Sequence, residues 1–80
     1  MRIINETKIN ILVDGDEISP NDSCKVDERC FDTHTIMSEH GRIVITTEYC
    51  HRDFKHIGKL KAVELDTRDN NGQKFIRIFE

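Results

Sequence analysis

The chain has 80 residues and a net charge of -3, so it is long enough for one domain, residues 1–80, with a thin hydrophobic core. The weak negative charge argues against a generic nucleic-acid binder, whose affinity depends on an excess of basic side chains. No apolar run is long enough for a signal peptide or a membrane span, so we expect a cytoplasmic protein with no membrane partner.

The N-terminal part of the chain predicts short strands joined by a tight turn. Residues 2–4 are apolar and predict an edge strand, and residues 8–13 alternate between apolar and polar positions, as a half-buried strand does. An Asp-Gly dipeptide at 14–15 favours a two-residue hairpin turn, which would place Ile11 opposite Ile18.

The middle of the chain predicts a loop followed by a central hairpin. Residues 19–33 fit either a short helix or an irregular acidic loop, and we expect a loop that holds one helical turn. Residues 35–49 predict two strands that turn at the His-Gly dipeptide 40–41, with Ile36 opposite Ile45. Both faces of this hairpin are rather apolar, which favours a central position in the sheet.

The C-terminal part predicts a helix and a last hairpin. Apolar residues recur at helical spacing over 50–57, which predicts a helix of about two turns. Residues 59–79 predict two strands around the Asn-Gly turn at 71–72, with Leu65 opposite Ile78; a four-residue loop would shift the pairs by two and keep the faces. In both registers the apolar face consists of Val63, Leu65, Ile76 and Ile78.

These elements predict a mainly β fold (β-rich α+β). We expect a small antiparallel meander of hairpins, with up to six strands, curled into a barrel or half-barrel and carrying one or two short helical pieces. The residues match no family motif, so function has to be inferred from the side chains themselves.

The cysteines and histidines raise the question of a metal site. Three cysteines, an odd number, fit a reducing compartment with free or metal-bound thiols. Extending the hairpin register brings Cys30 opposite His51, so a tetrahedral zinc site is geometrically possible. The residues that could take part are Cys24, Cys30, Cys50 and His51, with His34 and His56 nearby in the sequence. The close cysteine pair of a zinc ribbon is missing, so the simpler interpretation is small core or boundary cysteines, and we expect no cofactor.

No group of residues points to catalysis. Cys50 stands beside His51, but sequence neighbours rarely adopt the geometry of a nucleophile and its base, and no oxyanion-hole loop is recognisable. The acidic turns lack the ligand spacing of a calcium loop, and hairpin chemistry explains them more simply. We therefore expect no catalytic residues and no enzyme.

Acidic side chains dominate the segment from 14 to 32. They are Asp14, Asp16, Glu17, Asp22, Asp27, Glu28 and Asp32. Such a segment is either a solvated loop or a surface that binds a basic site on another protein. Our leading hypothesis is a small, non-catalytic protein-binding module, an inhibitor of phage or bacterial origin that blocks a functional surface of a larger protein.

Two other partners follow from the remaining surfaces. A basic run could contact nucleic acid, which we regard as the alternative function, in a small β-barrel that zinc could stabilise. Its residues are Tyr49, Arg52, Lys55, Lys59 and Lys61. The simpler interpretation of this run is the charged outer face of a short helix. Phe75 and Phe79 on the amphipathic face of the last hairpin leave room for a homodimer.

Overall fold

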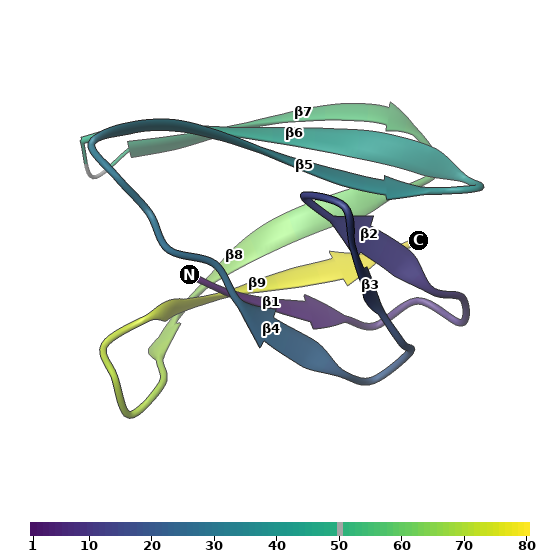
Figure 1. The fold of residues 1–80 in the computed structure, drawn as a ribbon, viewed down its shortest axis with the longest axis horizontal. Helices are drawn as coiled ribbons and strands as arrows, with labels where there is room; N and C mark the ends of the chain where they lie inside the picture. Colours follow the sequence, from purple (N-terminus) through teal and green to yellow (C-terminus); the bar gives the residue numbers. More distant parts are fainter. Residues whose placement is uncertain (50) are drawn as a thin grey trace.

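The computed structural model describes residues 1–49 and 51–80, and these residues form nine strands and no helix (Figure 1). One sheet has the order β4 (Ser23–Lys25), β1 (Arg2–Asn5), β9 (Lys74–Phe79) and β8 (Lys61–Arg68). The other has the order β3 (Asp16–Ile18), β2 (Ile11–Val13), β5 (Phe31–Ser38), β6 (Gly41–Glu48) and β7 (His51–Gly58). The chain is therefore mainly β, as its sequence predicts.

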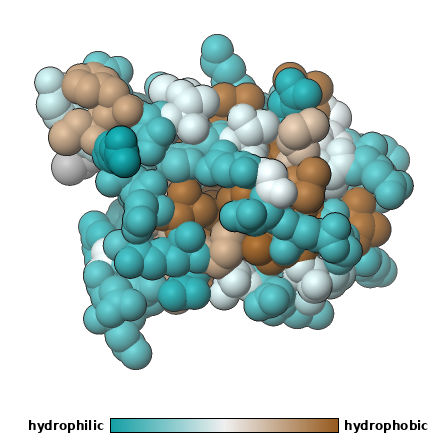
Figure 2. Space-filling view, viewed as in Figure 1, coloured by the Kyte–Doolittle hydropathy of each residue, from teal (hydrophilic) through white to brown (hydrophobic). Residues whose placement is uncertain are grey.

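The two sheets form two layers and do not close into a barrel, so the expected curled meander is not confirmed (Figure 1). The hydrophobic core consists of Met1, Ile3, Ile11, Val13, Ile18, Val26, Ile36, Ile43, Ile45, Leu60, Ile76 and Ile78. Figure 2 shows hydrophobic side chains in the middle of one face, where hydrophilic ones cover them incompletely. The thin core expected of a short chain thus lies between two small sheets.

The first strand lies at the centre of the four-stranded sheet and not at its edge, so the predicted edge position of residues 2–4 is wrong. β1 pairs with β9 in parallel, with Ile3 opposite Ile76, and with β4 on its other side. Because β9, the last strand of the chain, lies beside β1, the first strand has a neighbour on each side. Local sequence carries no signal for a pairing between strands so distant along the chain.

Both expected helical pieces are wrong. Residues 23–25 within the segment 19–33 form the edge strand β4, and residues 51–58 form β7, which pairs with β6 along its whole length. Phe54 lies on the inner side, where it packs against the core, whereas the Ile57 side chain is 60% exposed. A helical spacing of apolar residues therefore occurs in an edge strand that is only partly covered.

All three predicted hairpins exist, but only the first has its predicted register. The Asp-Gly turn places Ile11 opposite Ile18, which confirms the prediction. In the central hairpin Ile36 faces Ile43 and not Ile45, because Ser38 already pairs with Gly41 and the turn lies one residue earlier than predicted. The error is two residues, so the inward and outward faces are preserved.

The terminal hairpin exists, but both predicted registers are wrong. Ala62 pairs with Ile78, and the register shifts between Glu64 and Arg68, where the strand carries a bulge. Ile76 and Ile78 are buried as predicted, whereas Val63 lies on the opposite face and is 39% exposed. Glu64 pairs with Ile76 just before the bulge, on the same face of β8 as Ala62, and this places it in the site described below.

Candidate functional site

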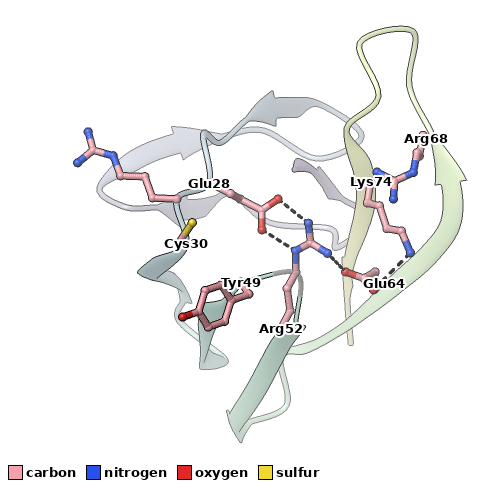
Figure 3. A pocket seen from close by; sticks show the side chains of 8 residues that line it. Glu28, Cys30, Tyr49, Arg52, Glu64, Arg68 and Lys74 are labelled. Atoms are coloured by element: carbon pink, nitrogen blue, oxygen red, sulfur yellow. Dashed lines mark hydrogen bonds and ion pairs between the residues drawn. The ribbon is translucent and has the colours of Figure 1, made fainter.

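The principal site is a cleft of about 590 Å³ between the two sheets, at the end where the β6–β7 hairpin faces the β8–β9 hairpin (Figure 3). Its lining residues are predominantly charged. They are Glu28, Arg29, Cys30, Tyr49, Arg52, Glu64, Arg68 and Lys74. They come from the loop after β4, from the β6–β7 turn, from β7, and from both strands of the terminal hairpin, so the cleft exists only when the two sheets are assembled.

Arg52 is the central residue of the cleft. Its Nε and Nη2 donate to the two carboxylate oxygens of Glu28 at 2.6 and 2.5 Å, and its Nη1 donates to Glu64. A guanidinium that forms two parallel hydrogen bonds to one carboxylate is held strongly and in a fixed orientation. Figure 3 shows this chain of ion pairs crossing the cleft from Glu28 through Arg52 to Glu64 and Lys74.

The carboxylate of Glu28 has a second partner, the α-ammonium group of Met1. That nitrogen is fully buried, lies 3.1 Å from Glu28 Oε1 and donates to the Val26 carbonyl oxygen at 2.8 Å. Burial alone would raise the pKa of Glu28, but the hydrogen bonds from Arg52 and from the ammonium outweigh burial and bring the pKa from 4.5 down to about 2. Glu28 is therefore a fixed negative charge at neutral pH.

A second concavity, the outer groove, has a volume of about 470 Å³ and lies on the outer face of the five-stranded sheet. It is lined by Asn10, Ile11, Leu12, Glu17, Met37, Ser38 and Glu39. Glu17, Leu12 and Met37 are direct neighbours across β3, β2 and β5. Leu12 is 39% exposed and Met37 is 37% exposed, so the groove has an apolar floor and an acidic rim.

The structure separates the acidic residues that the sequence groups together. Glu28 points into the cleft, whereas Glu17 lies on the outer groove and accepts a hydrogen bond from Asn10 at 2.9 Å. Asp14 and Asp32 contact a buried histidine. The side chains of Asp16, Asp22 and Asp27 are exposed, and that of Asp27 is 3.8 Å from Lys25.

The basic run is separated as well. Arg52 is committed to its two carboxylates, and Lys55 alternates to the opposite, outer side of β7. Lys61 lies on the other sheet and faces away from the buried side of β9, because its neighbour Ala62 is the residue opposite Ile78. Tyr49 lines the cleft. Tyr49 and Arg52 share the cleft, whereas Lys55, Lys59 and Lys61 are exposed and are not among its lining residues, so the structure brings together only two of the expected nucleic-acid residues.

The hypothetical zinc site is not assembled by the described residues. No group of three histidine, cysteine or acidic side chains among residues 1–49 and 51–80 could hold a metal ion. Cys30 lies beside Tyr49, whose N–H donates to the Cys30 carbonyl oxygen, and His51 pairs with Glu48, so the expected Cys30–His51 neighbourhood is wrong. Burial and the nearby charge of Asp16 raise the pKa of the Cys24 thiol. Cys50, also in that hypothesis, lies outside the described residues.

His34 is a buried histidine between two carboxylates. Its Nδ1 is 2.6 Å from Asp14 Oδ2, and its Nε2 is 3.3 Å from Asp32 Oδ2 without hydrogen-bond geometry. Asp14 also accepts a hydrogen bond from the Thr35 N–H at 2.8 Å, so it ties the β2–β3 turn to β5. These contacts give His34 a structural role in the five-stranded sheet.

Sequence reasoning missed the residues that complete both sites. Glu64, Arg68 and Lys74 belong to a hairpin whose predicted register pointed them elsewhere, and the bulge in β8 carries no sequence signal. Leu12 and Met37 were recognisable as apolar residues on strands, but their exposure depends on which face the second sheet covers.

Helices long and apolar enough to cross a membrane are absent from the described part of the chain. Comparisons with protein-family models, curated proteins and solved structures find no match to this chain.

Proposed function

We propose that this chain is a small, non-catalytic protein-binding module that holds a basic segment of a larger protein in its outer groove. The observation that carries the proposal is the combination of exposed Leu12 and Met37 with the carboxylates of Glu17 and Glu39 around them. Binding there would cover a functional surface of the partner, so the module would act as an inhibitor.

The chemistry of the outer groove fits a lysine or arginine side chain in particular. Such a side chain can lay its aliphatic stem on an apolar floor while its charged end reaches a carboxylate. Met37 supports this binding, because a flexible thioether side chain adapts to different apolar surfaces. Asn10 supports it as well, because its amide holds the Glu17 carboxylate in place at 2.9 Å.

The outer groove is a better candidate for the binding surface than the acidic segment 14–32 taken as a whole. Glu28 is bound by Arg52 inside the cleft, and Asp14 is bound by His34. These two carboxylates therefore serve the fold. Glu17 remains available, and Glu39, from outside the segment, joins it at the outer groove. Electrostatic complementarity of this kind increases the association rate and selects the partner.

The test uses a short fluorescein-labelled peptide in which lysine alternates with leucine, titrated with the protein and followed by fluorescence anisotropy. We expect saturable binding. The double variant Glu17→Lys and Glu39→Lys, which reverses both charges, should weaken binding about tenfold or more. Leu12→Ser should also weaken binding, without any change in charge. The same peptide with glutamate in place of lysine should not bind.

The matched control reverses two exposed acids elsewhere, Asp22→Lys and Asp27→Lys, which changes the net charge equally. This variant should bind the lysine peptide within about twofold of the original chain at physiological salt, because screening removes distant charge effects. An equal loss in both double variants would show that net charge, and not the outer groove, attracts the peptide, and the proposal would then fail.

A further inference from the structure

The inter-sheet cleft carries an excess of positive charge, although the chain as a whole is negative. Its two carboxylates are both occupied. Glu28 binds Arg52 and the Met1 ammonium, and Glu64 binds Arg52 and, at 3.8 Å, Lys74. Among the described residues, no carboxylate lies within ion-pair distance of Arg29 or Arg68, the other two cationic side chains of the lining. Arg68 Nη1 donates to the Gly72 carbonyl oxygen at 2.9 Å, and its remaining N–H groups, together with Arg29, give the cleft capacity for an anion.

Arg68 and Lys74 are direct cross-strand partners, one on β8 and one on β9. Like charges in that position repel each other and destabilise a sheet. Figure 3 shows the two side chains next to each other on one wall of the cleft, with Lys74 extending towards Glu64. An anion bound between them would remove the repulsion, and a phosphate offers enough oxygen acceptors for both a guanidinium and an ammonium group.

The other wall of the cleft carries an aromatic ring. Tyr49 packs edge to face with Phe31, with ring centroids 5.0 Å apart and planes inclined at 66°, and its side chain is still 68% exposed. A ring that is supported on one side and open on another is a stacking platform for a planar base. The cleft volume of about 590 Å³ lies within the usual range for small-molecule sites.

We propose that the cleft binds a nucleotide, whose phosphate lies between Arg68 and Lys74 and whose base stacks on Tyr49. The Glu28–Arg52–Glu64 ion pairs form the floor and fix the distance between the two walls. The site is separate from the outer groove, so it does not depend on the proposed protein partner.

The first experiment is isothermal titration calorimetry with adenosine monophosphate at low salt, compared with adenosine. We expect saturable binding of the monophosphate with a Kd of about 1 mM or tighter, and binding of adenosine at least about tenfold weaker. The double variant Arg68→Gln and Lys74→Gln should weaken monophosphate binding about tenfold or more. A matched control, Lys55→Gln and Lys59→Gln, removes two exposed lysines from outside the cleft and should change the Kd less than about twofold.

A second pair of titrations separates the base from the phosphate. Tyr49→Ser should weaken adenosine monophosphate about fivefold or more and leave inorganic pyrophosphate unchanged. Tyr49 is the single tyrosine and the chain has no tryptophan, so the variant has no tyrosine fluorescence, and calorimetry measures both ligands in both proteins. The proposal is overturned if the monophosphate shows no saturation, if adenosine binds equally well, if the control variant loses as much affinity as the cleft variant, or if Tyr49→Ser has no effect. Circular dichroism of each variant verifies that it is folded.

Discussion

Arg52 shows how one partly buried cation can hold together parts of the chain that have no contact through backbone pairing. It links the loop residue Glu28 to Glu64 on the opposite sheet, and the Arg52 side chain is 14% exposed. Charges with so little water around them are costly unless they are paired, so the network favours one relative placement of the sheets over others. Nearby opposite charges keep both partners ionised, because they raise the pKa of Arg52 and lower that of Glu28.

Glu28→Gln should destabilise the fold by about 2 kcal/mol at neutral pH, because it leaves Arg52 without its bidentate partner. The folded pKa of Glu28, about 2, is below the ordinary value of 4.5, so its contribution to stability is complete above pH 4.5 and is lost as the pH falls towards 2. The difference in unfolding free energy between the original chain and Glu28→Gln should therefore shrink across that window. Urea unfolding at a series of pH values measures it.

Asp27→Asn is the matched control for this titration. Asp27 is the neighbouring residue, but its side chain is 92% exposed and its ion pair with Lys25 is 3.8 Å long. Its removal should have almost no effect on stability at any pH. Other carboxylates with lowered pKa values, Glu6 and Asp69, are present in every variant and cancel in the comparison. A constant difference between Glu28→Gln and the original chain down to pH 2 would contradict the prediction.

At the scale of elements, the chain crosses from one sheet to the other between β7 and β8, and the backbone is tightly packed at this crossing. Gly41 at the start of β6 pairs with Gly58 at the end of β7, just before the chain passes to β8. A Cβ atom on Gly58 would lie 2.5 Å from the His40 carbonyl oxygen, and one on Gly41 would lie 2.3 Å from the Ile57 carbonyl oxygen. The glycines therefore allow β7 to leave one sheet and β8 to enter the other.

Gly58→Ala should destabilise the protein much more than Gly72→Ala, although both glycines have similar positive φ angles, 81° and 78°. At Gly72 no atom of the described residues lies within 4 Å of an added Cβ, so alanine there incurs only backbone strain of about 1 kcal/mol. At Gly58 the same strain is joined by a collision with backbone atoms, and we expect a total loss of about 3 kcal/mol or more. Urea denaturation of both variants measures the two values, and equal losses would show that the crossing is not tightly packed.

Elements with a local cause could be predicted from the sequence, and elements with a distant cause could not. The Asp-Gly turn fixes the Ile11–Ile18 pair within a few residues, so its register was predictable. The strand at 51–58 is a strand because β6 lies beside it, and its apolar residues fit a helix equally well. The cleft could not be predicted for the same reason, since Glu28, Arg52 and Glu64 are brought together only by the packing of the two sheets.

At the scale of the whole molecule, the two sheets differ in the sequence separation between their paired strands. The strands β5, β6 and β7 follow one another and pair through short turns. The four-stranded sheet depends on the parallel pairing of β1 with β9, which brings together the two ends of the chain. Closing so long a loop costs more conformational entropy than closing a hairpin, so the local meander should form first during folding.

Two substitutions of identical chemistry test this order. Ile45 on β6 and Ile76 on β9 are both fully buried in the core, so Ile45→Val and Ile76→Val should each destabilise the protein by about 1 kcal/mol. If the meander is formed in the transition state, Ile45→Val will mainly slow folding and Ile76→Val will mainly speed unfolding. Stopped-flow refolding and unfolding in urea separates the two effects. The reverse pattern would mean that the pairing of the chain ends, and not the meander, nucleates the fold.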